Sequence, residues 1–108
     1  HLSVTMKPII IISTYPNKKS ITKIATELIQ NKIVACVNIT EISSIYSWQG
    51  KIQNSSEYLA LFKTTQKNKK SLKEKIMKTH PYEVPEIAEI DIASINKSYL
   101  KWLVESTI

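Results

Sequence analysis

Apolar positions near the N-terminus change from a continuous run to a helical period. Residues 7–15, KPIIIISTY, hold four consecutive isoleucines after Pro8, which is typical of a fully buried strand. From residue 21 the apolar residues recur three or four positions apart, as on one stripe of an amphipathic helix: Ile21, Ile24, Ala25, Leu28 and Ile29. We expect Asn17 or Ser20 to cap this helix at its N-terminus.

Residues 34–64 have the pattern of a β-hairpin that is longer than average. A β-rich stretch runs from Val34 to Trp48, and the only glycine, Gly50, marks a turn. The segment EYLALFKT, residues 57–64, then runs back as the partner strand.

The chain after the hairpin predicts a helix, a strand and a last helix. Residues 65–79 are rich in lysine, with Leu72 and Ile76 on a narrow apolar face. Pro81 ends this helix, because a proline disfavours helical geometry in the residue before it. Residues 96–107, NKSYLKWLVEST, form the last helix, with three residues expected to pack: Tyr99, Trp102 and Leu103.

The segment between these helices alternates in polarity. Ile90 and Ile92 fall on one face, and Glu89 and Asp91 fall on the other, which predicts a strand with its acids on a solvated side. The element order is then β-α-β-β-α-β with an extra C-terminal helix. That order predicts an α+β, ferredoxin-like sandwich whose antiparallel sheet carries both helices on one face.

Length and composition indicate one globular domain. The chain has 108 residues, 43% of them apolar and 22% charged, as in soluble single-domain proteins. We place the domain at residues 6–108 and interpret residues 1–5 as an addition before a native start at Met6, or as a disordered N-terminus. No apolar run is long enough to span a bilayer. One cysteine, Cys36, excludes an internal disulfide, so we expect a cytoplasmic location.

The positive charge is carried by lysine alone. The fifteen basic residues include no arginine, and the formal net charge is +6. Arginine is the residue that most often contacts bases and phosphates. Its absence makes nucleic-acid binding a less favoured function for this chain. An acylphosphatase-like enzyme is also disfavoured, because that family holds phosphate with an arginine.

The segment KTHPYEVPEI, residues 78–87, is the first candidate site. Between Thr79 and Asn96 there is no lysine, but there are four of the nine acidic residues, and a local acidic strip concentrates cations. His80 adds a nitrogen ligand, and Glu83 and Glu86 add carboxylates, so these three are candidate metal ligands. The alternative is a histidine that ends a helix beside a solvated strand. His1 is a weaker candidate, because it lies at the terminus.

Cys36 is the fourth candidate metal ligand. With His80 it offers the sulfur and nitrogen that copper and zinc prefer, although a lone cysteine in ACVNI is also typical of a small buried apolar residue. One chain supplies too few such ligands for a closed tetrahedral site. A strong site would therefore need carboxylates, water or a second subunit.

Five aromatic residues are candidates for stacking on nucleic-acid bases: Tyr46, Trp48, Tyr58, Phe62 and Tyr82. Tyr58 and Phe62 share one strand face, as in RNA-recognition domains. The basic residue and glycine that such domains place before their aromatics are missing from SSEYLALFK. Core packing is the better explanation.

Several motifs together resemble the CutA family of divalent-cation tolerance proteins. They are ACVNI (35–39), SIYSWQGKI (44–52), KT (63–64), HPYEVPEI (80–87) and YLKWL (99–103). The resemblance implies a homotrimer similar to nitrogen-regulatory PII proteins, non-enzymatic, with a role attributed to copper and other divalent ions and no obligatory cofactor. The long hairpin also favours a trimer held by strand pairing, because it has more apolar strand than a small monomer should leave at an open sheet edge. PII-like sensing of a small ligand is the alternative function.

The resemblance further implies a cleft between subunits. The residues carried over to it are Cys36, Trp48, Glu57, Lys63, His80, Tyr82 and Glu86. Lys63 is interpreted either as facing a carboxylate or anionic ligand there, or as a strand-end lysine that reaches solvent.

Two departures from the CutA pattern bear on the site. Thr40 and Glu41 stand where these chains commonly have Pro-Gly, so we expect a β-bulge in place of the usual bend. The additional cysteines of some relatives are also missing, which argues against coordination by several thiolates.

Overall fold

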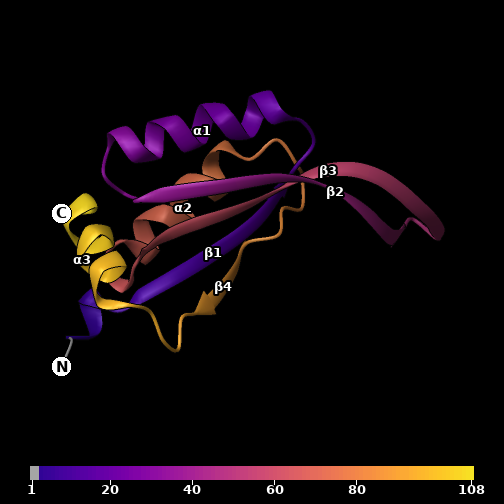
Figure 1. The fold of residues 1–108 in the computed structure, drawn as a ribbon. Coiled ribbons are helices and arrows are strands. Elements are labelled where there is room, and N and C mark those ends of the chain that lie inside the picture. The colour runs from indigo at the N-terminus through magenta and orange to yellow at the C-terminus, as the bar shows by residue number, and fades with distance from the viewer. Residues whose placement is uncertain (1–2) are drawn as a thin grey trace.

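A computed structural model describes residues 3–108 of the chain (Figure 1). The elements in chain order are η1 (Val4–Met6), β1 (Pro8–Tyr15), α1 (Lys18–Gln30), β2 (Cys36–Trp48), β3 (Lys51–Thr65), η2 (Gln66–Asn68), α2 (Lys69–Thr79), β4 (Ala88–Asp91) and α3 (Lys97–Ser106). The strands form one antiparallel sheet in the order β2-β3-β1-β4. The predicted ferredoxin-like α+β fold is thereby confirmed. Of the helices within the described residues, none is long and apolar enough to cross a membrane.

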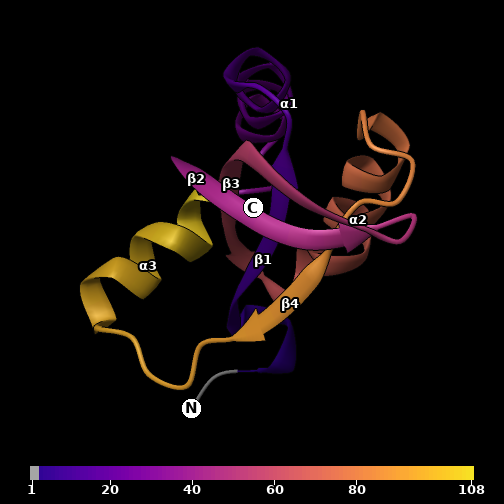
Figure 2. The same cartoon turned by 90° about the vertical axis from the view of Figure 1, so that its right-hand side faces the viewer.

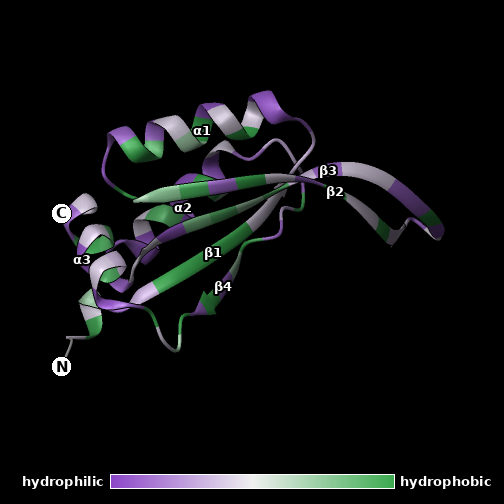
Figure 3. Ribbon diagram, viewed as in Figure 1, coloured by the Kyte–Doolittle hydropathy of each residue, from purple (hydrophilic) through white to green (hydrophobic). Residues whose placement is uncertain are grey.

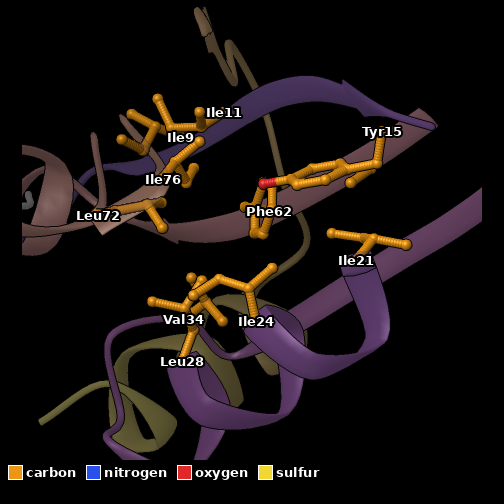
Figure 4. Close-up of a cluster of buried hydrophobic side chains, with 11 residues drawn as sticks. Ile9, Ile11, Tyr15, Ile21, Ile24, Leu28, Val34, Phe62, Leu72 and Ile76 are labelled. Carbon is orange, nitrogen blue, oxygen red and sulfur yellow. The ribbon is translucent and has the colours of Figure 1, made fainter. Parts of the chain in front are cut away.

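The core lies between one face of the sheet and the helices α1 and α2. Ile9 and Ile11 of β1 and Phe62 of β3 meet Ile24 and Leu28 of α1, and all five are buried (Figure 4). The residues Leu72 and Ile76 complete this cluster from α2. Figure 3 shows β1 as hydrophobic over most of its length, as expected for a strand at the centre of the sheet.

The predicted N-cap and apolar stripe of α1 are confirmed, with one exception. Asn17 caps the helix, and its side chain accepts a hydrogen bond from the Ser20 backbone N–H over 2.8 Å. Ile29 was placed on the buried stripe but is 45% exposed. It lies about 80° around the helix from Ile21, which takes it beyond the edge of the contact with the sheet.

The hairpin of β2 and β3 turns through two residues in left-handed backbone geometry. Gln49 has φ 51° and Gly50 has φ 78°, as in the type I′ turn that suits the twist of a hairpin. The pairing is unbroken from Cys36 opposite Lys63 to Trp48 opposite Lys51. The expected bulge is therefore wrong: residues 40 and 41 continue the strand and pair with residues 59 and 58. The outer half of the hairpin extends past the rest of the fold (Figure 1).

The two faces of β4 are the reverse of the prediction. Glu89 points to the side of α2, where its carboxylate oxygens lie 2.9 Å from Lys73 Nζ and 3.4 Å from Lys69 Nζ. Ile90 points to the opposite side and is 45% exposed. The lysines of α2 draw the acid inward, so the apolar residue of β4 is left on the face without a helix layer.

That second face of the sheet, here called the open face, is largely apolar. Side chains alternate along each strand, so the neighbours of the core residues point away from α1 and α2: Ile10, Ile12, Leu59, Leu61 and Ile90. Of the described helices that follow the hairpin, α3 approaches this side, and Figure 2 shows α2 and α3 on opposite sides of β1. Of the packing predicted for α3, Leu103 is buried, whereas Trp102 is 46% exposed.

Candidate functional site

The loop after α2 occupies the end of β1 that β4 leaves uncovered. β4 pairs with residues 9–12 of β1, so within residues 3–108 no strand pairs with Ser13, Thr14 and Tyr15 on that edge. The loop begins at His80, which ends α2 in extended geometry before Pro81, as a residue before proline should. The helix stop thus brings the HPYEVPEI segment to the edge of the sheet.

His80 is packed and hydrogen-bonded through both ring nitrogens. Its ring stacks on Tyr15 with centroids 4.3 Å apart. Nδ1 accepts the backbone N–H of Tyr82 at 3.1 Å, so in the neutral ring Nε2 carries the proton and donates it to Ser13 Oγ at 3.0 Å. Burial lowers the pKa of His80, although a hydrogen bond to the Thr14 backbone and the charge of Glu57 oppose that effect. His80 can bind a metal only by giving up one of these bonds.

The side chain of Tyr82 extends from the loop to the other side of the sheet, where it hydrogen-bonds to Glu57. Its Oη donates a hydrogen bond to Glu57 Oε2 over 2.6 Å. Burial, and next the hydrogen bond to Glu57, raise the pKa of the Tyr82 hydroxyl, so it remains a donor. The Glu57 residue is 9% exposed. Within residues 3–108, nothing hydrogen-bonds to its second oxygen, Oε1, and no lysine pairs with it.

A cleft of about 340 Å³ opens beside this pair. Five of its lining residues were expected from the sequence: Trp48, Glu57, Tyr82, Glu83 and Glu86. The strand register explains part of this grouping, because Trp48 and Glu57 point to the same face of the β2–β3 pair. The structure therefore joins two candidate metal ligands with three residues of the expected cleft.

Three lining residues of the cleft were missed as site residues: Thr14, Tyr46 and Val84. Tyr46 was assigned to the core with the other aromatics. That assignment is confirmed for Phe62, which is buried, and for Tyr58, which packs against the core. It is wrong for Tyr46 and Trp48, which are 44% and 47% exposed. The signal that could have found Tyr46 is its two-residue spacing from Trp48 on one strand.

Cys36 and Lys63 lie at the other end of the sheet. They face each other across β2 and β3, and Lys63 is six residues along β3 from Glu57, which is about 20 Å. Lys63 Nζ lies 5.7 Å from the centre of the Tyr99 ring, and Cys36 Sγ is 3.8 Å from Asn38 Oδ1. Neither residue reaches the cleft of its own chain.

The described side chains of one subunit do not form a metal site by themselves. Across the part of the chain that the structure describes, no three His, Cys, Asp and Glu side chains are grouped closely enough to hold one. The four candidates His80, Cys36, Glu83 and Glu86 are therefore not a preformed set within one subunit. His1 lies outside the described residues.

Comparison with known proteins gives one consistent family. A family model described as CutA1 divalent ion tolerance protein matches residues 9–106. The divalent-cation tolerance protein CutA of Pyrococcus horikoshii is 40% identical over 99 residues, which are 92% of this chain and 97% of that protein. A crystal structure of CutA1 from the same organism has a TM-score of 0.89, with 93% of this chain and 98% of that chain covered at 40% identity.

Two further relatives bear on cellular location. The Archaeoglobus fulgidus structure, described as a periplasmic divalent cation tolerance protein CutA, has a TM-score of 0.89 at 31% identity and covers 94% of this chain and 99% of that one. The chloroplastic protein CutA of Arabidopsis thaliana is 40% identical over 106 residues, 97% of this chain and 58% of that protein. The expected cytoplasmic location is thereby overturned, because relatives this similar are named for two other compartments.

Proposed function

Because the chain belongs to the CutA1 divalent ion tolerance family, we propose that it is a non-enzymatic homotrimer that binds divalent cations at the cleft. The observation that carries this proposal is the cleft's charge. Glu57, Glu83 and Glu86 line it, and no lysine does, although the chain as a whole has a net charge of +6. A locally negative cleft on a basic protein attracts cations.

The metal ligands would come from more than one chain. Glu83 and Glu86 are exposed and able to reach an ion, whereas His80 must first release Tyr82 N–H or Ser13. Cys36 is too far from its own cleft and would have to be supplied by a neighbouring subunit. Such a mixed carboxylate, nitrogen and sulfur set ranks copper above other first-row divalent ions, and magnesium and calcium below them.

The open face of the sheet supports an assembly of identical chains. Ile10, Ile12, Leu59 and Leu61 are all partly exposed there, and a contiguous apolar surface of this kind marks an interface. Identical copies of the chain are always present together, so the partner that covers this surface is a second copy. The number of subunits, three, rests on the resemblance to CutA and PII proteins.

A Ser–His pair is present, but its burial and its protonation state argue against a catalytic role. Ser13 Oγ lies 3.0 Å from His80 Nε2, the spacing of a nucleophile and its base. Ser13 is 0% exposed, however, so no substrate reaches it. Nε2 also carries the proton in the neutral ring, so it cannot take one from the serine.

Calorimetric titration with Cu(II) tests the proposed metal binding. We expect modest affinity for copper, weaker binding of magnesium and calcium, and a fold that survives chelation. Binding should fall in Glu83→Gln/Glu86→Gln, which removes two carboxylates, and at pH 5, where protons compete with the metal for an imidazole ligand. Glu74→Gln, on the exposed side of α2, is the matched control. Copper binding that is unchanged in the double variant would contradict the proposal.

Cys36→Ser and His80→Ala then separate the other two ligands. A loss of copper affinity in Cys36→Ser would place the thiol of a neighbouring subunit at the ion. A loss in His80→Ala, with the assembly intact, would show that the ring gives up one of its two hydrogen bonds to bind metal.

A second candidate function is the sensing of a small ligand. The observation that favours it is the size of the cleft, about 340 Å³, which lies within the range of small-molecule sites.

A further inference from the structure

The outer surface of the helices α1 and α2 carries the net positive charge of the chain. We call residues 18–32 and 66–79, which comprise both helices, η2 and the turn after α1, the basic layer. It holds ten of the fifteen lysines and two of the nine acidic residues, so its formal charge is +8 and the rest of the chain carries −2. Within residues 3–108, Lys69 and Lys73 pair with Glu89, and the other eight lysines of the layer make no ion pair.

The basic layer lies on the side of the sheet opposite the open face. The helices α1 and α2 contact each other and bury their apolar stripes against β1 and β3. Four exposed lysines therefore point away from the sheet: Lys19 and Lys23 of α1, and Lys70 and Lys78 of α2. Packed helices lie about 8–10 Å apart, within the Debye length of about 10 Å at 0.1 M salt, so the charges of the two helices act together. An assembly through the open face leaves this layer in solvent.

The side chains of the layer indicate the kind of anion that it fits. Its lysines are point charges that suit phosphate and carboxylate groups in any orientation. The segments α1 and α2 contain neither arginine nor an aromatic residue, the groups that contact or stack on nucleic-acid bases. They do expose apolar side chains among the lysines, because Ile29 is 45% and Met77 is 59% exposed. Lysines beside exposed apolar groups on a helix are typical of surfaces that bind anionic lipid.

We propose that the basic layer binds the surface of a membrane that contains anionic phospholipids. Lysines from both helices pair with the headgroups, and Ile29 and Met77 enter the headgroup region. Met77 follows Lys70 by seven residues, so both side chains lie on the same side of α2 and reach one surface together. This inference concerns a surface apart from the cleft, and it does not depend on metal binding.

Co-sedimentation with lipid vesicles tests the proposal on the assembled protein with EDTA present. The probe is a vesicle of phosphatidylserine and phosphatidylcholine in equal amounts, and vesicles of phosphatidylcholine alone are the control. We expect binding to the anionic vesicles, at least tenfold weaker binding to the neutral ones, and release when the salt is raised from about 0.1 M to about 0.5 M. Equal binding to both kinds of vesicle, or binding to neither, would overturn the proposal.

Two pairs of substitutions separate the basic layer from the net charge of the protein. Lys23→Gln/Lys70→Gln removes one exposed lysine from each helix and should weaken binding to anionic vesicles at least tenfold. Lys51→Gln/Lys101→Gln removes the same charge from exposed positions on β3 and α3 and should change binding less than about twofold. All four positions are exposed, and glutamine is close to lysine in helix propensity, so the fold should persist. Equal weakening by the two pairs would show that net charge alone governs binding and would overturn the proposal.

A last comparison separates a membrane from a soluble polyanion. Met77→Gln should weaken binding to anionic vesicles at least threefold, because it removes an apolar group from the headgroup region. The same substitution should leave the salt-dependent retention of duplex DNA unchanged, since it removes no charge. Equal effects on vesicles and DNA, or tighter binding of DNA than of anionic vesicles at the same salt, would overturn the assignment to a membrane.

Discussion

The hydroxyl of Tyr82 lies 2.6 Å from Glu57 Oε2 and joins two segments that are 25 residues apart in the chain. Glu57 belongs to β3, and Tyr82 belongs to the loop that follows α2. The bond gives one oxygen of a nearly buried carboxylate a donor and shapes one wall of the cleft. The same loop packs His80 on the far side of β1, so the fold and the cleft depend on one short segment.

Removing the Tyr82 hydroxyl should destabilise the protein. In Tyr82→Phe, Glu57 keeps its burial but loses the donor to Oε2, and an unsatisfied buried acceptor costs about 1–3 kcal/mol. We expect a lower urea midpoint at fixed protein concentration. Tyr58→Phe is the control, because no hydrogen bond of the Tyr58 hydroxyl is found among residues 3–108. Equal midpoints for the two variants would mean that the bond contributes nothing.

Protonation of His80 should weaken the fold. Burial lowers the pKa of His80 below its usual 6.5, so the unfolded chain takes up a proton at higher pH than the folded chain does. The stability that comes from the neutral ring is fully present above about pH 6.5 and declines as the pH falls through the folded pKa. A protonated Nδ1 would also oppose the Tyr82 N–H.

Denaturation at pH 7.5 and pH 5.5 measures this effect. The matched variant is His80→Phe, which keeps a ring against Tyr15 and cannot titrate. Wild type should lose more stability than the variant between the two pH values. A larger or equal loss in His80→Phe would show that other groups govern the pH dependence.

Local patterns were enough to predict most of the fold. The isoleucine run predicted β1 and the apolar stripe predicted α1, because the spacing that distinguishes a strand from a helix is contained within each segment. The two faces of β4 were not predictable in this way. Alternation separates Glu89 from Ile90, but it does not say which side holds the lysines of α2, so the buried and solvated faces of β4 were predicted the wrong way round.

The site required information that no local pattern contains. Trp48, Glu57 and Tyr82 meet through strand register and a loop crossing, and their grouping was expected only from the resemblance to CutA. The pairing of His80 with Cys36 came from ligand chemistry alone. In the structure, the register places Cys36 opposite Lys63, far from the end of β1 where His80 packs.

The hairpin turn should respond to changes in backbone preference. Gly50 has φ 78°, and a Cβ added there would meet no atom within 4 Å. Gly50→Ala therefore costs only the left-handed backbone energy, about 1 kcal/mol. Gln49→Asn should have the opposite effect, because asparagine tolerates the φ of 51° better than glutamine. Urea midpoints that move in any other order would contradict the turn geometry.

The open face should prove to be the surface that joins the subunits. Leu61 lies near its centre, paired with Ile12 on one side and Asn38 on the other. Covering a leucine of this kind is worth about 1.5–3 kcal/mol in each subunit, and Leu61→Lys replaces that gain with a charge that must leave water. In a free monomer the lysine can extend to solvent from this partly exposed position, so the fold itself should persist. We expect light scattering after size exclusion to find a trimer for wild type and a monomer for Leu61→Lys at micromolar concentration, with the same circular dichroism. Ile29→Lys, at the exposed position on α1, is the control and should remain trimeric. A trimer that persists in Leu61→Lys would move the interface away from this face, and a wild-type monomer would reject the assembly altogether.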